Sequence, residues 1–140
     1  MPRAPKRKTL VRNLDIVFSR FVRLRDYDVS KMQIKCITCN AKKQKIKDIH
    51  NGHFMSRRFY PTRWHEDNCA PQCAHCNTYS QGQQYLFSLW LGHSLADEMY
   101  QLSKTKNRFT DDELKDMIAH FKERVKYLET TKFKGILDKI

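Results

Sequence analysis

The chain has 140 residues, the size of one domain, and carries 27 Lys and Arg against 15 Asp and Glu. The resulting net charge of +12 is typical of proteins that bind phosphates, so it favours nucleic acid as the partner. The alternative is that the charge only keeps a small protein dissolved. No apolar stretch reaches the roughly 20 residues of a membrane-spanning helix, so we expect no membrane partner.

The first half of the chain begins with a basic, proline-containing segment. Residues 1–9 include Pro2 and Pro5 and are predicted to form a flexible arm that either contacts phosphates or remains idle. From Leu10 onward, apolar residues recur at helical spacing, which predicts a helix ending near residues 26–28. We expect a single domain over 10–140, with this N-terminal helix within 10–30, a core over 31–92 and a helical region over 93–140.

Four cysteines form two Cys-x2-Cys hooks separated by 33 residues: Cys36, Cys39, Cys73 and Cys76. This spacing lets all four thiolates surround one ion, so it predicts a structural zinc site. Two disulfides or free buried thiols are the alternatives. They are disfavoured because no apolar secretory segment opens the chain, which favours a reducing cytoplasm. Cys69 is interpreted as a loop thiol.

The segment between the hooks mixes strands with basic and aromatic residues. Residues 33–35 predict a short strand, and residues 44–54 predict a hairpin that carries His50 and His53. A loop then supplies cations and flat rings suited to phosphates and exposed bases, namely Arg57, Arg58, Tyr60, Arg63 and Trp64. The alternative is a solvated loop with one or two rings in the core.

The second half of the chain predicts three helices. The first covers about 81–91 and ends at Gly92, and the next covers 94–104 with Ser94 as its cap. A capping box at Thr110 opens the third helix, which runs to about residue 129. Its apolar stripe predicts either core packing or the seam of a possible homodimer: Phe121, Val125 and Leu128.

A histidine near a predicted zinc site suggests phosphodiester hydrolysis. Such a reaction needs a base for the attacking water and an electrophile for the charge that grows on phosphorus. His53 has the right chemistry for the base, and Mg²⁺ or Mn²⁺ would supply the electrophile, with Asn77 offering an oxygen ligand. Zinc bound by four thiolates has no open position for this task.

The chain resembles the phage recombination endonucleases called NinG or Rap over roughly residues 10–92. The resemblance rests on Phe21-Val22-Arg23-Leu24-Arg25-Asp26, Cys-x2-Cys, Gly-His-Phe-Met-Ser-Arg-Arg at 52–58, Thr62-Arg63-Trp64, Asn68, Gln72-Cys73, Cys76-Asn77 and Gly82. More loosely, the chain is similar to HNH, or His-Me finger, nucleases, including phage endonuclease VII. This resemblance implies an α+β, mainly helical fold, in which a ββα-metal core with a structural four-cysteine zinc is flanked by an N-terminal helix and C-terminal helices.

The resemblance also implies roles for individual residues. His53 would be the general base, and Asn77 would bind the catalytic ion. Asn68 would brace the loop or polarise the base. His50 corresponds to a position that is Asp or His in this family, so it is a second candidate ligand. Many HNH nucleases have Asp at the place of Gly52, so the usual carboxylate ligand is missing.

Arg57 and Arg58 are expected to hold the cleaved phosphate, because guanidinium groups bind phosphate oxygens in pairs. The resemblance implies a metal-dependent DNA endonuclease that cuts branched recombination intermediates such as Holliday junctions or D-loops. If the protein is encoded by a phage, the host cytoplasm is its expected location. The alternatives are a zinc-stabilised DNA-binding protein without catalysis and an HNH nuclease that acts on linear duplex DNA.

Overall fold

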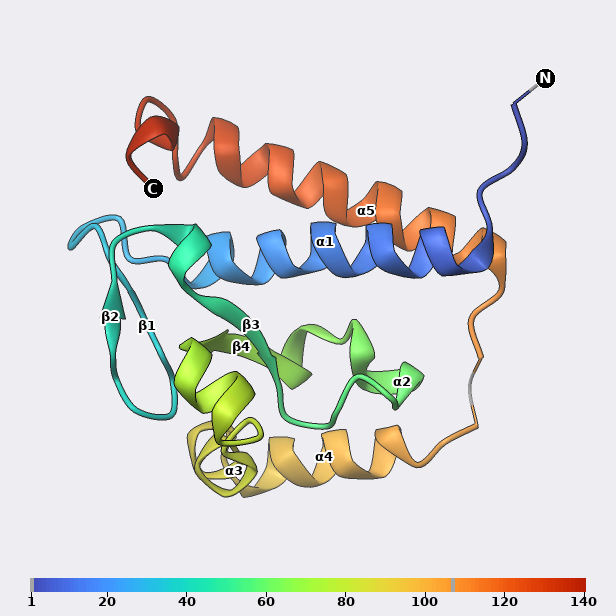
Figure 1. Cartoon of the computed structure of the whole chain (residues 1–140), viewed down its shortest axis with the longest axis horizontal. Coiled ribbons are helices and arrows are strands. Elements are labelled where there is room, and N and C mark those ends of the chain that lie inside the picture. Colours follow the sequence, from blue (N-terminus) through green and yellow to red (C-terminus); the bar gives the residue numbers. More distant parts are fainter. Residues whose placement is uncertain (1, 107) are drawn as a thin grey trace.

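The two longest helices of the computed structural model, which describes residues 2–106 and 108–140, lie side by side (Figure 1). Helix α1 covers Arg7–Asp26 and α5 covers Asp111–Thr130. Residues 7–9 therefore belong to α1, which shortens the predicted flexible arm. The capping box that opens α5 is confirmed, because the Thr110 side chain accepts a hydrogen bond from the Glu113 N–H and the Glu113 carboxylate accepts one from Thr110.

The main core lies between α1 and α5. The rings of Phe18 and Phe21 on α1 pack against Phe121 on α5, with centroid distances of 4.9 and 5.3 Å. Phe121 and Val125 are both buried in this core. The α5 stripe therefore closes the chain's own core, and the dimer-seam interpretation is wrong for these two residues.

Two small antiparallel sheets follow α1 in the chain, and the second of them packs against it. Strand β1 (Ile34–Lys35) pairs with β2 (Lys42–Lys43), and β3 (His50–His53) pairs with β4 (Cys69–Gln72). The hairpin predicted within 44–54 is therefore wrong. A 3₁₀ turn at Ile46–Asp48 comes before β3, and the partner of β3 is 19 residues further along, with His50 opposite Gln72 and His53 opposite Cys69.

Short helices follow each strand of the second sheet. Helix α2 (Tyr60–Arg63) follows β3, and a helical turn at His75–Tyr79 follows β4. Helix α3 covers Gln84–Leu91 and α4 covers His93–Ser103, capped at its N-terminus by Gly92 rather than by the predicted Ser94. The structure is thus a mixed helix and sheet fold. In the described part of the chain, none of the helices is long and apolar enough to cross a bilayer.

Candidate functional site

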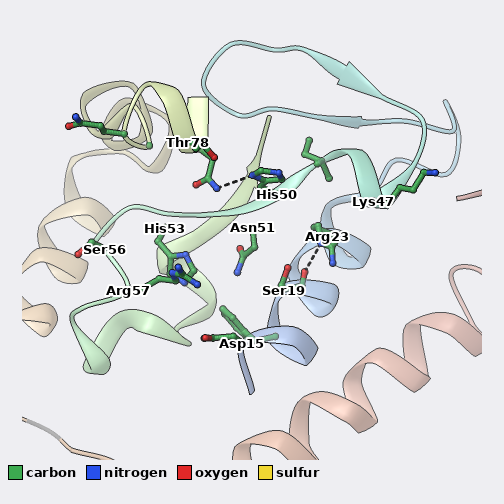
Figure 2. Close-up of a pocket in the computed structure, with 15 residues that line it drawn as sticks. Asp15, Ser19, Arg23, Lys47, His50, Asn51, His53, Ser56, Arg57 and Thr78 are labelled. Carbon is green, nitrogen blue, oxygen red and sulfur yellow. Dashed lines mark hydrogen bonds between the residues drawn. The ribbon is translucent and has the colours of Figure 1, made fainter. Parts of the chain in front are cut away.

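A cleft of about 720 Å³ lies between α1, β3 and the segment after the second cysteine hook (Figure 2). Its lining includes His50 and His53 from β3, Asp15 and Arg23 from α1, and also Arg57 and Asn77. The structure therefore brings four of the predicted site residues to one cleft: His50, His53, Arg57 and Asn77. Two of the basic groups that line it, Arg57 and Lys47, are exposed.

The four predicted zinc ligands come together beside this cleft. Their Sγ atoms all lie within 4.8 Å of one another, and those of Cys39 and Cys73 are 3.6 Å apart. A tetrahedral zinc with bonds of about 2.3 Å places its sulfurs roughly 3.8 Å apart, so the donor set fits the ion. Cys69 lies outside the cluster, and its interpretation as a loop thiol is wrong, because it is a buried residue of β4. Burial raises the pKa of its thiol, which keeps it neutral.

The surroundings of Cys36 favour its thiolate over its thiol. Burial alone would raise the pKa of Cys36, but hydrogen bonds from the Thr38 hydroxyl and from backbone N–H groups bring it down to about 6. These hydrogen bonds favour the thiolate, which is the form that binds zinc. The cluster joins the end of β1 to the turn that carries Asn77.

The geometry of His53 defines which ring nitrogen can accept a proton. Its Nε2 lies 2.8 Å from the main-chain oxygen of Arg63, and a carbonyl oxygen only accepts, so Nε2 carries the hydrogen. Nδ1 then holds the free lone pair, and it has no hydrogen-bond partner within residues 2–106 and 108–140. Burial, the largest cause, and the nearby charge of Arg57 lower the pKa of His53 to about 4, against the opposing effect of the Arg63 oxygen. The imidazole is therefore neutral at pH 7.

Asp15 on α1 fixes the segment that holds His53. Its carboxylate accepts hydrogen bonds from Nε and Nη2 of Arg63 at 3.0 and 2.6 Å, and one from Nε1 of Trp64 at 2.9 Å. This carboxylate holds the side chain of Arg63, and the main-chain oxygen of the same residue accepts the hydrogen bond from His53. Sequence reasoning missed Asp15, because its partners lie 48 and 49 residues away and no local pattern marks it.

These contacts correct two predicted DNA contacts. Trp64 is only 4% exposed, so its ring is not available to stack on a base. The Arg63 side chain is 15% exposed and donates to both Asp15 oxygens, so its guanidinium is committed within the protein. The alternative interpretation, in which rings of this loop enter the core, agrees with the structure.

The two candidate ligands of a catalytic ion meet in the cleft. Nδ2 of Asn77 lies 3.1 Å from Nδ1 of His50. The dashed line at His50 in Figure 2 marks this hydrogen bond. An ion held between them would need the amide oxygen, rather than the nitrogen, to face it. Asp15 is the only carboxylate that lines the cleft among the described residues, and it is occupied by Arg63 and Trp64.

The structure explains why glycine precedes His53. A Cβ atom at position 52 would collide with the side chain of Gln72, which is on β4 two residues beyond Ala70, the partner of Gly52 in the register. Gln72 is fully buried, and its Nε2 donates to the Gly82 oxygen at 2.8 Å and to the Thr38 hydroxyl at 3.1 Å. The amide of Gln72 therefore occupies the space that the carboxylate of an Asp-His pair would need.

Asn68 and Arg58 lie apart from the cleft lining. The fully buried Asn68 side chain accepts from the Met55 N–H and donates to the oxygens of Met55 and Thr62, which are the contacts of a loop brace. The exposed Arg58 guanidinium lies 4.9 Å from the ring of Phe59. Arg57 is thus the better placed of the two predicted phosphate ligands.

Comparison with known proteins identifies the family of the chain. No curated protein matches it, and no solved structure does. One family model, described as Bacteriophage Lambda NinG protein, matches residues 3–131, which is nearly the whole chain. The chain therefore belongs to the NinG family.

Proposed function

We propose that this protein is a divalent-metal-dependent DNA endonuclease of the His-Me finger type. The observation that carries the proposal is the tautomer of His53, whose Nε2–H is bound by the Arg63 oxygen so that Nδ1 keeps its lone pair. This imidazole lines an open cleft together with an exposed arginine and the adjacent pair His50 and Asn77. The order of β3, β4 and the helical turn that carries Asn77 also agrees with a ββα-metal core.

Each of these side chains has a task in phosphodiester hydrolysis. Nδ1 of His53 accepts a proton from the attacking water. Arg57 pairs with oxygens of the cleaved phosphate and offsets the charge that develops there. Bound DNA places negatively charged phosphates near His53. One of these phosphates also forms an ion pair with Arg57, whose charge lowers the pKa of His53 in the free protein. The pKa of His53 therefore rises when DNA binds, which makes the imidazole a stronger base.

His50 and Asn77 would hold the catalytic ion, together with water and phosphate oxygens from the substrate. A bound divalent ion supplies a Lewis acid for the phosphate and for the leaving oxygen. Imidazole and amide donors without a free carboxylate suit Mn²⁺ better than Mg²⁺, which prefers carboxylates. We therefore expect faster cleavage with Mn²⁺ than with Mg²⁺ at equal concentrations. The cysteine cluster holds a zinc with a structural role, because four thiolates leave it no open position.

Branched DNA is the proposed substrate, and this part of the proposal rests on the resemblance to phage recombination endonucleases. Two alternatives remain to be tested against it. The first is a nuclease that acts on linear duplex DNA, and the second is a zinc-stabilised protein that binds DNA without cutting it. The basic charge and the cysteine cluster agree with all three.

The test is a cleavage assay on a four-way junction and on a linear duplex of the same sequence, each with Mn²⁺ or Mg²⁺. Wild-type protein should cut the junction, and His53→Ala should bind it without cutting. His93→Ala, an exposed histidine at the start of α4, is the matched control and should cut normally. Equal cutting of both DNAs would favour the linear-duplex nuclease. Intact binding and zinc content without cutting by any divalent ion would favour the non-catalytic protein.

A further inference from the structure

The segment 31–47, which we call the lysine hairpin, carries charge of one sign only. It contains the strands β1 and β2 and lies at the C-terminal end of α1 (Figure 1). It has no acidic residue and six basic ones: Lys31, Lys35, Lys42, Lys43, Lys45 and Lys47. None of the six forms an ion pair with any residue that the structure describes; Lys45 donates instead to the main-chain oxygen of Lys139.

Two of these lysines face each other across the strands. The register pairs Lys35 directly with Lys42, and both side chains are exposed, whereas the neighbouring residue Ile34 is buried. Like charges directly opposite each other on one face of an antiparallel pair destabilise it. This arrangement therefore costs folding free energy, and the cost is removed if a polyanion binds across the pair.

The lysine hairpin is held in place relative to the cleft. The Ile37 N–H donates to the Pro71 oxygen of β4 at 3.0 Å, and two of the four clustered cysteines lie between β1 and β2. At its other end, the oxygen of Ile46 accepts from Nη1 of Arg23, and the next residue, Lys47, lines the cleft (Figure 2). The positive charges of the lysine hairpin therefore begin at Lys47 in the cleft and extend outward along a segment that is fixed to the rest of the protein.

We propose that the lysine hairpin is a second DNA-binding element, which holds the phosphate backbone next to the cleaved bond. This inference rests on the proposed endonuclease function and adds to it a contact surface outside the catalytic residues. The hairpin binds phosphates through charge and is indifferent to base sequence, because lysine ammonium groups act as point charges. Lys35 and Lys42 contact the backbone directly, and Lys47 leads it towards Arg57 in the cleft.

The test compares DNA binding of two double variants as a function of salt, both in the His53→Ala background so that DNA is not cut. Lys35→Gln/Lys42→Gln removes the facing pair, and Lys122→Gln/Lys126→Gln removes two exposed charges from α5, across α1 from β3. Each lost phosphate contact lowers the slope of log affinity against log salt by about 0.9, so two contacts lower it by about 1.8. The same relation gives roughly 60-fold weaker binding at 0.1 M salt. The α5 variant should change neither quantity by a comparable amount.

Folding is checked on the same samples. Since Lys35→Gln/Lys42→Gln removes a repulsion, it should unfold at the same or a higher urea concentration and keep its zinc. Lys35→Glu is a second variant with an equal charge change, and it replaces the repulsion with a cross-strand ion pair to Lys42. It should also weaken DNA binding while keeping the fold.

The outcomes separate this inference from the proposed function. If both hairpin variants keep the salt slope of the His53→Ala parent while the wild-type protein cuts the junction, the role of the hairpin is overturned and the endonuclease proposal stands. If the wild-type protein neither binds nor cuts DNA, the endonuclease proposal fails and the hairpin proposal fails with it. Weaker binding in the hairpin variants, with unchanged binding in the α5 variant, supports the role of the hairpin, and junction cutting by the wild-type protein supports the endonuclease.

Discussion

The substitution Asp15→Asn tests whether α1 controls the imidazole of His53. It keeps the shape of the side chain and removes its charge. One oxygen of Asn can still accept from Nε of Arg63 and from Trp64, which both bond to Oδ1 now. The amide nitrogen cannot accept from Nη2 of Arg63, so that contact is lost.

The expected loss of stability in Asp15→Asn depends on how deeply the ion pair between Arg63 and Asp15 is buried. The Arg63 and Asp15 side chains are 15% and 24% exposed, so solvent screens their interaction only in part. A hydrogen bond with a charged partner contributes about 1.5 to 3 kcal/mol. We expect the free energy of unfolding to fall by about 2 kcal/mol. The charge of Asp15 also raises the pKa of His53, so that pKa should fall further in the variant.

Two assays measure the consequences of Asp15→Asn for stability and for the His53 imidazole. Urea unfolding measures the stability loss, and ¹H–¹⁵N NMR spectra of the imidazole report whether His53 still carries its hydrogen on Nε2. A displaced Arg63 oxygen should weaken that tautomer preference and slow junction cleavage by about 10- to 100-fold, with little change in DNA affinity. Asp116→Asn, an exposed residue on α5, is the matched control and should behave like wild type.

A folded Asp15→Asn protein with the wild-type His53 tautomer and the wild-type cleavage rate would refute the control of His53 by Asp15. Because the NMR readout does not depend on activity, it decides the role of Asp15 even if the protein is not a nuclease. A loss of stability alone, with an unchanged His53 spectrum, would make Asp15 a structural residue only.

Three further predictions concern the fold around the cleft. Cys39→Ser should lose zinc and unfold, and a folded, zinc-free variant detected by metal analysis and circular dichroism would contradict the zinc site. Gly52→Ala should lower the free energy of unfolding by about 1 to 3 kcal/mol through the collision with Gln72, and the loss should shrink in a Gln72→Ala background; equal losses in both would exclude that collision. Because the pKa of His53 is about 4 in the folded protein and 6.5 ordinarily, the unfolded chain binds more protons between these values, so stability should fall on the order of 3 kcal/mol as pH drops from about 6.5 to 4. Urea unfolding across this range should show that dependence in wild type and lose much of it in His53→Gln.

Local patterns in the sequence predicted the elements that depend on near neighbours. The capping box at Thr110 predicted the start of α5, and the paired cysteine hooks predicted a cluster whose four sulfurs the structure brings together. Both signals need only a few residues at fixed spacing, because one follows from helix geometry and the other from the coordination of a metal ion.

Features that depend on distant partners were not predictable in the same way. The pairing of β3 with β4 joins a short polar strand, His-Asn-Gly-His, to a short buried strand, Cys-Ala-Pro-Gln, and nothing in residues 50–53 identifies 69–72 as the partner. Trp64 is a residue type that stacks on bases, yet its indole is buried in the core, where Asp15, 49 residues earlier, accepts its N–H. A carboxylate on a helix gives no sequence signal for such a contact.

Two separate anchors hold the cleft, and they act on different atoms. The cysteine cluster positions the turn that carries Asn77, whereas Asp15 positions the Arg63 oxygen that binds His53. Asp15 makes no hydrogen bond or ion pair to the cysteine cluster within the described residues. Asp15→Asn should therefore alter the His53 imidazole while the protein keeps its full zinc content, and zinc loss in that variant would show that the two anchors are coupled.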